Sequence, residues 1–388
     1  MDSIFLALSP RRRLRFIYLG VLLLSFHYYV TAYVNASVLA QYVPESVIGI
    51  LYTLGALATI AGLLLLPREL RLFGNFRTLL FLIILKLGAT LAFAFASSGL
   101  AVSALFILNQ ALAAFIFFVL DAYLEQATPK EGATGTVRGL FLAAANLALV
   151  VSALLGGTLA ATGFRNVYLV SALFLGLLLF LSVLHLRIRG SAVRVPDFGK
   201  ALTCFIHERS LRGVLFASYL LQIYYAFMVI YTPLYLIRHL GLPWETAGLL
   251  LSVMLLPFLL FELPIGALAD RKTGEKEIMA IGFSAMAFFT VLWPFVENVW
   301  LLAVVLFMTR VGAAMVEITT ESYFFKKVDG NRPDLISIFR LNSPVSFLVG
   351  PLIGSLLFAF FSYHGLFFAL GTLMLLGIFV ALSLKDTR

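Results

Sequence analysis

The feature that most constrains this chain is a series of long, continuously apolar segments. Twelve runs follow one another, each long enough to cross a hydrocarbon core of about 30 Å with about 20 residues. They cover residues 15–40, 45–66, 76–97, 100–124, 136–161, 164–187, 211–239, 244–268, 277–296, 299–324, 334–361 and 363–384. The runs do not alternate between apolar and polar residues as the strands of a membrane barrel do. The pattern therefore predicts an all-α polytopic membrane protein with twelve transmembrane helices.

Composition and charge agree with this class. The chain is 62% hydrophobic and 12% charged, whereas an average soluble domain is about 25% charged. If the amino terminus is cytoplasmic, 24 of the 28 lysines and arginines fall on the cytoplasmic side, and the exceptions are Lys86, Arg165, Arg238 and Arg310. This asymmetry predicts that both termini are cytoplasmic. Topology and anionic lipid thus explain the net charge of +9, and we expect no nucleic-acid partner.

The two halves of the chain resemble each other. VSALLGGTL begins at Val151 and VGPLIGSLL begins at Val349, 198 residues later and close to half the chain length. Transporters are often built from such repeats, with the substrate held where the repeats meet. We therefore predict a six-helix bundle over residues 1–187, a cytoplasmic linker over 188–210 and a second six-helix bundle over 211–388.

The loop after the eighth run carries a recognisable pattern. Residues 266–276 read GALADRKTGEK, which resembles the G-x-L-x-D-R-x-x-G-x-K loop motif of the major facilitator superfamily. The resemblance implies two pseudo-symmetric six-helix bundles around a cavity that opens alternately to each side, lined chiefly by spans 1, 4, 7 and 10. It also leads us to expect a monomer, surrounded by lipid, in a prokaryotic cytoplasmic (inner) membrane.

Two positions depart from the family pattern. The loop after span 2, PRELRLFGNFR at residues 67–77, lacks the acidic residue of the motif. Span 5 has Ser152–Gly157 where the family's antiporters carry G-P-x-x-G-G. Small residues permit close helix packing in any case, so we prefer a packing role for this segment to an antiport role.

Span 10 has the most informative buried charges. Arg310, Glu317 and Glu321 are spaced by seven and eleven residues from the arginine, which places all three within about 20° of one helix face. Glu317 is then a candidate proton-coupling carboxylate, and Glu262 on span 8 is a second one. The alternative is a structural ion-pair ladder that involves Arg271 and Arg340.

Charged residues also cluster at the cytoplasmic ends of the spans. On the resemblance to the family's gate pairs, we interpret them as a cytoplasmic gate, although solvated charges without a role are the alternative. The candidates are Asp121, Glu125, Arg138, Asp270, Arg271, Glu321 and Arg340.

Polar residues near the midplane form a candidate substrate site, although each one can equally well join helix to helix. The candidates are His27, Tyr28, Asn109, Gln110, Asn146, Gln222, Tyr224, Tyr225, Arg310 and Asn342. Arg310 has no midplane carboxylate beside it in the sequence, which favours a polar or anionic organic solute over a cationic drug. Lys86, on a span that the resemblance makes peripheral, is interpreted as reaching for the interface.

Several functions lack their motifs. The sequence contains no P-loop, no H-E-x-x-H and no nucleophile elbow, and its five histidines and single cysteine are scattered. We therefore expect no metal, no cofactor and no enzyme activity. The prediction is a secondary active transporter that moves a small solute with protons. A multidrug-type proton antiporter that exports amphipathic compounds, a passive uniporter, a transporter-fold receptor and an intramembrane enzyme remain alternatives.

Overall fold

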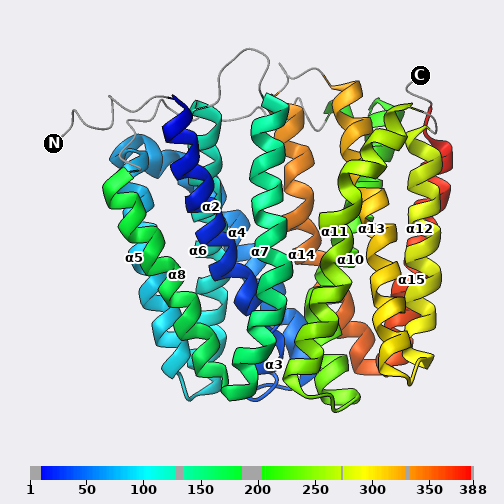
Figure 1. The fold of residues 1–388 in the computed structure, drawn as a ribbon, viewed down its shortest axis with the longest axis horizontal. Helices are drawn as coiled ribbons and strands as arrows, with labels where there is room; N and C mark the ends of the chain where they lie inside the picture. The colour runs from blue at the N-terminus through cyan, green and yellow to red at the C-terminus, as the bar shows by residue number, and fades with distance from the viewer. Residues whose placement is uncertain are drawn as a thin grey trace. The chain divides into compact units, whose positions relative to one another are not determined.

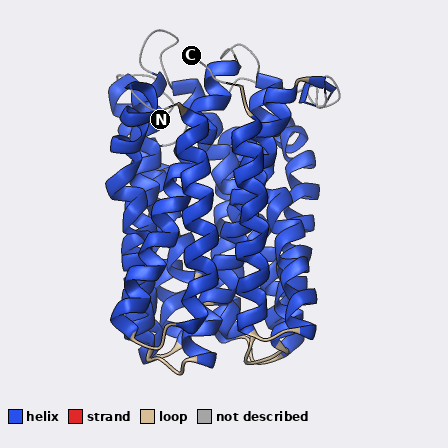
Figure 2. Ribbon diagram, turned by 90° about the vertical axis from the view of Figure 1, so that its right-hand side faces the viewer, coloured by secondary structure: helices blue, strands red, loops and turns tan. Residues whose placement is uncertain are grey.

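A computed structural model describes residues 10–127, 134–185, 203–205, 207–271, 274–328 and 333–385. These residues form helices joined by loops, and none of them is in a strand (Figure 2). Twelve helices within this part of the chain are long and apolar enough to cross a membrane. The prediction of an all-α protein with twelve spans is therefore confirmed.

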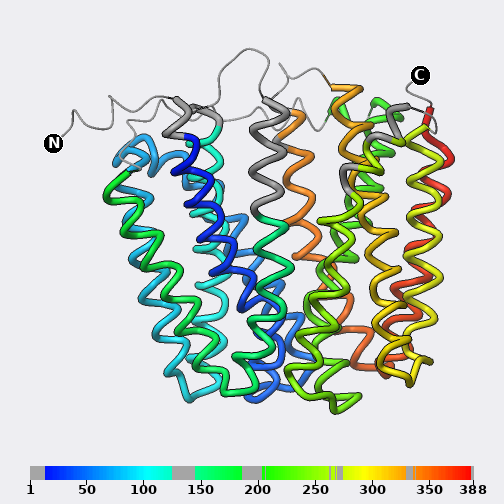
Figure 3. The backbone as a smooth tube through the Cα atoms, viewed as in Figure 1, coloured from blue at the N-terminus to red at the C-terminus, as the bar shows by residue number. Residues whose placement is uncertain are grey.

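The first six spans are joined mostly by short turns, as the backbone trace in Figure 3 shows. Gly74, at a φ of +80°, occupies one such turn, and this is a backbone conformation that glycine adopts without strain. The helices are α2 (Pro10–Ala32), α3 (Asn35–Leu39), α4 (Glu45–Phe73), α5 (Asn75–Phe95), α6 (Gly99–Ala127), α7 (Thr134–Thr162) and α8 (Phe164–His185).

The other six spans include two short elements of a different helical type. One is the π-helix η1 (Tyr235–His239), and the other is the 3-10 helix η2 (Trp293–Phe295). The α-helices are α10 (Arg209–Leu234), α11 (Trp244–Arg271), α12 (Glu275–Leu292), α13 (Val299–Lys327), α14 (Pro333–Phe360) and α15 (Tyr363–Ser383).

The first apolar run is not one straight helix, as the predicted span over 15–40 implied. Helix α2 ends at Ala32, and the short α3 begins at Asn35. Near the break, the Thr31 hydroxyl donates to the Tyr28 carbonyl, and the Val34 amide bonds the Thr31 carbonyl in a tightened turn. Such back-bonding by threonine bends helices, so the apolar run continues while the helix does not.

The seventh span changes helical type at its end. Pro233 lies in the last turn of α10, where it lacks the amide that would continue the helix ladder. The π-helix η1 follows at once, and the Leu240 amide bonds the Tyr235 carbonyl at 2.9 Å. Arg238 and His239 are the last two residues of η1.

The chain divides into two compact units by its contacts. Unit 1 comprises residues 1–44, 54–195 and 241–249, and unit 2 comprises 45–53, 196–240 and 250–388. Within unit 1, α2 packs on α6, α7 and α8, and α5 packs on α6 and α8 (Figure 1). Within unit 2, α12 packs on α13 and α15, while α10 packs on α13, α14 and α15. The division into bundles over 1–187 and 211–388 stays a prediction.

Small residues allow close helix contacts in both units. A side-chain carbon added at Gly282 of α12 would lie 2.7 Å from the Gly312 carbonyl of α13, and one at Gly312 would lie 2.6 Å from the Gly282 carbonyl. In unit 1, one at Gly156 would lie 2.7 Å from the Val30 carbonyl. The Gly156 contact agrees with the packing role preferred for residues 152–157.

Candidate functional site

Helix α13 carries the central residues of the candidate site. Asn298 caps its start by accepting hydrogen bonds from the Trp300 and Leu301 amides. From there the helix continues unbroken, and it brings Arg310 and Glu317 to α10. Arg310 is buried, with 1% of its surface exposed, and Glu317 is half-buried. The spacing of seven residues thus places both side chains against one neighbouring helix.

The Arg310 guanidinium lies among aromatic rings. Its Cζ atom is 5.4 Å from the ring centre of Tyr224 and 5.4 Å from that of Tyr225. Each such contact stabilises a desolvated cation by about 0.5–2 kcal/mol. The Nε and Nη1 atoms, however, have no hydrogen-bond partner among the residues that the structure describes. Rings alone do not satisfy these buried N–H groups, so the site retains unused donors of the kind that a carboxylate or phosphate accepts.

The two adjacent tyrosines use their hydroxyls differently. The Tyr225 hydroxyl donates to Oε2 of Glu317 at 2.8 Å, whereas the Tyr224 hydroxyl lies 2.9 Å from the Thr290 hydroxyl of α12. Tyr224 is fully buried and Tyr225 is half-buried. Tyr225 therefore contacts both the cation and the carboxylate of this site. The sequence analysis gave no role to Thr290, which shows no signal of its own in the sequence.

A second buried cation lies in unit 1. Lys86 of α5 is 5% exposed, and its Nζ donates to the side-chain oxygen of Asn109 at 2.8 Å and to the Asn109 carbonyl at 2.7 Å. The Thr90 hydroxyl lies 2.9 Å from the same Asn109 side-chain oxygen. The interpretation that Lys86 reaches for the interface is therefore wrong. Its amine is held by Asn109, which lies about 15 Å along α6 from the start of that helix.

Other midplane candidates contact neighbouring helices within their own unit. The His27 ring lies 2.6 Å from the Ser171 hydroxyl, which joins α2 to α8. The Asn342 amide donates to the Leu215 carbonyl at 3.1 Å, which joins α14 to α10. Tyr28 packs edge-on against Phe117. Gln110, Asn146 and Gln222 are half-buried.

The candidate gate is described only in part. Asp121 is half-buried, and Glu321 and Arg340 are exposed. The side chains of Glu125, Arg138, Glu262, Asp270 and Arg271 lie outside the described residues. The gate and the coupling role of Glu262 therefore stay predictions.

An ion pair at the start of α12 was not predicted from the sequence. Glu275 is 3% exposed and pairs with Lys326 of α13, and the Ser322 hydroxyl donates to Glu275 at 3.3 Å. Glu275 also lies in the first turn of its helix, where the helix dipole favours a negative charge. It belongs to the GALADRKTGEK motif, so the sequence did mark the segment, although not this residue.

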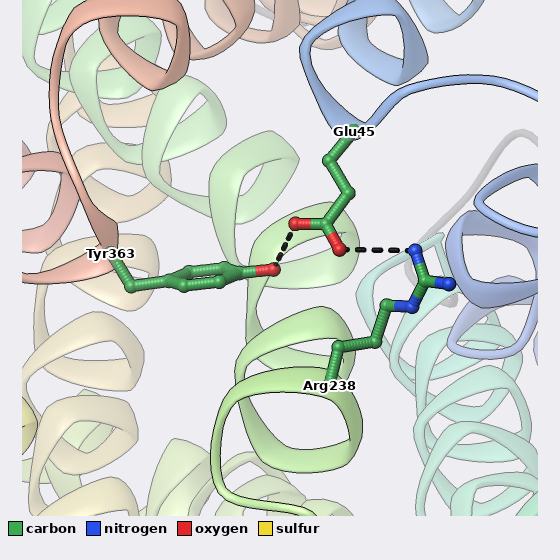
Figure 4. Close-up of polar contacts among 3 residues, drawn as sticks. All are labelled: Glu45, Arg238 and Tyr363. Carbon is green, nitrogen blue, oxygen red and sulfur yellow. Dashed lines mark hydrogen bonds and ion pairs between the residues drawn. The ribbon is translucent and has the colours of Figure 1, made fainter.

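A polar cluster lies at the other end of the spans in unit 2. Glu45, at the start of α4, accepts hydrogen bonds from Arg238 at 3.1 Å and from the Tyr363 hydroxyl at 2.5 Å (Figure 4). The His239 ring lies 5.3 Å from the Tyr363 ring, centre to centre. Sequence reasoning missed this cluster. The only signal was Arg238, one of two basic residues predicted to lie on the side with little positive charge.

Comparison with known proteins identifies a matching family and solved structures of similar fold. A family model described as Major Facilitator Superfamily matches residues 17–254 and 245–388. Among solved structures, the chain is similar to a mutant of the nucleoside transporter NupG, with a TM-score of 0.75 and 12% identity, over 97% of this chain and 99% of that chain. No curated protein matches the sequence.

Two further solved structures have the same fold. A structure concerned with substrate recognition in proton dependent oligopeptide transporters aligns with a TM-score of 0.75 and 12% identity, over 96% of this chain and 98% of that one. A D-xylose-proton symporter aligns with a TM-score of 0.74 and 15% identity, over 98% and 99%. At these identities the likeness shows the fold alone.

Proposed function

The chain belongs to the Major Facilitator Superfamily, and from this premise we propose that it is a secondary active transporter that moves a small polar or anionic organic solute together with protons. Arg310 is the proposed anion-binding residue, and Glu317 is the proposed proton-coupling residue. The family and the structural neighbours indicate a transporter rather than an enzyme, and the twelve spans indicate an integral multi-pass membrane protein. We further propose that it acts as a monomer in a prokaryotic inner membrane.

The observation that carries the proposal is the environment of Arg310. This side chain is 1% exposed, and its Nε and Nη1 have no hydrogen-bond partner in the described part of the chain. A buried charge without a partner is costly by several kcal/mol. A carboxylate or phosphate on the solute would supply both the missing acceptors and the opposite charge.

The same observation separates the proposal from its alternatives. An exporter of amphipathic cations would bring positive charge toward a buried guanidinium, which costs rather than gains free energy. A passive uniporter has no use for a half-buried carboxylate held by a tyrosine, as Glu317 is held by Tyr225. The names of two structural neighbours include proton-linked transport, which supports the coupling part of the proposal.

A two-stage experiment tests this function. The full chain, purified in detergent, is first screened by thermal shift against organic carboxylates, inorganic phosphate, sugars, nucleosides and lipophilic cations. A stabilising solute is then offered to proteoliposomes with and without an imposed proton gradient. We expect stabilisation by anions and gradient-driven accumulation that is sensitive to Arg310→Met. Stabilisation by lipophilic cations only, or accumulation indifferent to the gradient, would contradict the anion and the proton parts respectively.

A further inference from the structure

Consecutive tyrosines of α10 provide a natural comparison. Tyr224 and Tyr225 place their ring centres at the same 5.4 Å from Cζ of Arg310. Their hydroxyls have different partners, because that of Tyr224 meets the Thr290 hydroxyl and that of Tyr225 donates to Glu317. Tyr225→Phe therefore removes the hydroxyl contact with the carboxylate and keeps a ring beside the cation.

We propose that Tyr225 is the positioning residue that links anion binding at Arg310 to proton binding at Glu317. The inference rests on the proposed function and deepens it, because it names the physical connection between the two sites. Tyr225 presents its ring to the guanidinium and its hydroxyl to the carboxylate. The anion and the proton thereby act on the two ends of one side chain.

The link between anion binding and proton binding depends on the positive charge of Arg310. With no anion bound, the Arg310 guanidinium interacts with the Tyr225 ring, and the Tyr225 hydroxyl donates a charge-assisted hydrogen bond to Glu317. An anion on Nε and Nη1 neutralises the guanidinium and competes with the ring for it. The positive potential near Glu317 then falls, which favours proton uptake by that carboxylate. By reciprocity, a proton on Glu317 strengthens anion binding by the same factor.

The position of Glu317 depends on this tyrosine. A glutamate has three rotatable side-chain bonds, and ordering such a chain costs up to about 2 kcal/mol. The 2.8 Å bond from Tyr225 selects one orientation, and the ring of Tyr225 is itself held edge-on by Phe258 of α11, with centres 5.8 Å apart. Loss of the hydroxyl alone would leave the ring beside Arg310 and remove this hydrogen bond to the carboxylate.

Other ionisable groups on the helices around Glu317 have different environments. Glu321, one turn further along α13, and Arg340 of α14 are exposed. Glu275 of α12 is bound to Lys326, and the Tyr224 hydroxyl is beside Thr290. On α11, the Glu262 side chain lies outside the described residues. Tyr225 contacts Glu317 through its hydroxyl and Arg310 through its ring.

The experiment measures binding and proton uptake separately on the full chain in detergent. Sodium benzoate is the carboxylate probe and inorganic phosphate is the second probe. Binding is read as a concentration-dependent shift of the unfolding temperature, and proton uptake is read with a pH indicator in weak buffer when the probe is added. The variants are Tyr225→Phe, the matched control Tyr231→Phe, and Glu317→Gln. Tyr231 is on the same helix, and its hydroxyl donates to the Pro351 carbonyl at 3.3 Å.

We expect Tyr225→Phe to keep probe binding within about threefold while its proton uptake falls to about a tenth of wild type or less. Tyr231→Phe should retain both, and Glu317→Gln should bind the probe without proton uptake. Wild-type proton uptake in Tyr225→Phe, or an equal loss in Tyr231→Phe, would overturn the link. If Tyr225→Phe does not fold, Tyr225→His, which keeps a ring and a donor, should retain proton uptake, and its complete loss counts against the proposal.

A failure of the proposed function gives a different result. If neither benzoate nor phosphate stabilises the wild type, the anion site itself is refuted, and the link falls with it. If the probe binds and Glu317→Gln still takes up protons as the wild type does, the coupling role of Glu317 is refuted. Only normal binding and normal Glu317 behaviour with an unaffected Tyr225→Phe variant count against Tyr225 alone.

Discussion

The two buried cations, Lys86 in unit 1 and Arg310 in unit 2, have opposite surroundings. The Lys86 amine donates to two oxygens of Asn109. The Arg310 guanidinium has rings on two sides, while its Nε and Nη1 have no hydrogen-bond partner in the described part of the chain. Lys86 is thus satisfied by the fold, whereas two buried N–H groups of Arg310 have no acceptor among the described residues. The difference teaches that burial alone does not separate a structural charge from a candidate binding residue, and that unused donors are the second criterion.

The largest difference between the two sites is expected when each cation is replaced in a separate variant. Arg310→Met should weaken binding of the stabilising anion by at least about 30-fold, because a charged acceptor then loses the buried cation proposed to bind it. Lys86→Met should change that binding by less than about threefold, because the Lys86 amine is already bound to two oxygens of Asn109. Titration of the unfolding temperature against the anion measures both. Equal losses in the two variants would show that Lys86 also serves the solute.

The next largest effect is expected from replacing Glu317, which contacts Tyr225 as Arg310 does. Glu317→Gln keeps an oxygen that accepts from Tyr225 but cannot exchange a proton. Accumulation in proteoliposomes under an imposed proton gradient should fall to passive equilibration, while counterflow exchange without a gradient persists. Retained gradient-driven accumulation would refute coupling through Glu317. Glu297→Gln, on an exposed glutamate between η2 and α13, is the matched control and should keep accumulation above equilibrium.

Replacing the partner of Lys86 should lower the stability of the chain, because Lys86 depends on that partner for its hydrogen bonds. Asn109→Ala removes both side-chain interactions with Lys86 and Thr90, so we expect the chain to lose about 1–3 kcal/mol of stability, the typical cost of leaving a buried donor unsatisfied. The lowering of the unfolding temperature in detergent is the measurement. Thr90→Val removes one donor and should cost less. An unchanged unfolding temperature in Asn109→Ala would mean that Lys86 finds other acceptors.

The smallest effects should come from the cluster of Glu45, Arg238 and Tyr363. Arg238 is 41% exposed, and its ion pair with Glu45 is 3.1 Å long, so Arg238→Gln should cost about 0.5 kcal/mol. Tyr363→Phe removes the shorter bond to the half-buried Glu45 and should cost about 1 kcal/mol. Thermal unfolding compares the two. A larger loss in Arg238→Gln than in Tyr363→Phe would reverse the assignment of strengths.

Part of the candidate site was predictable because it depends on local geometry. The periodicity of a helix places Arg310 and Glu317 on one face wherever the helix lies, and the structure confirms that both meet α10. The same reasoning could not tell Tyr224 from Tyr225, because adjacent residues point about 100° apart and the rotation of α10 decides which one meets Glu317. The break between α2 and α3 was also not predicted, since hydropathy does not report where a helix ends within an apolar run.

The sequence by itself determined the twelve spans and the family. Apolar length is a local property set against a membrane of fixed thickness, and the GALADRKTGEK loop is a contiguous pattern. Only the tertiary structure decided which buried charges are satisfied. That outcome depends on helix rotation and on close approaches such as Gly282 against Gly312, which bring together side chains far apart in the chain. Lys86 and Arg310 are both cations within predicted spans, and the fold gives hydrogen-bond acceptors to the first and aromatic rings to the second.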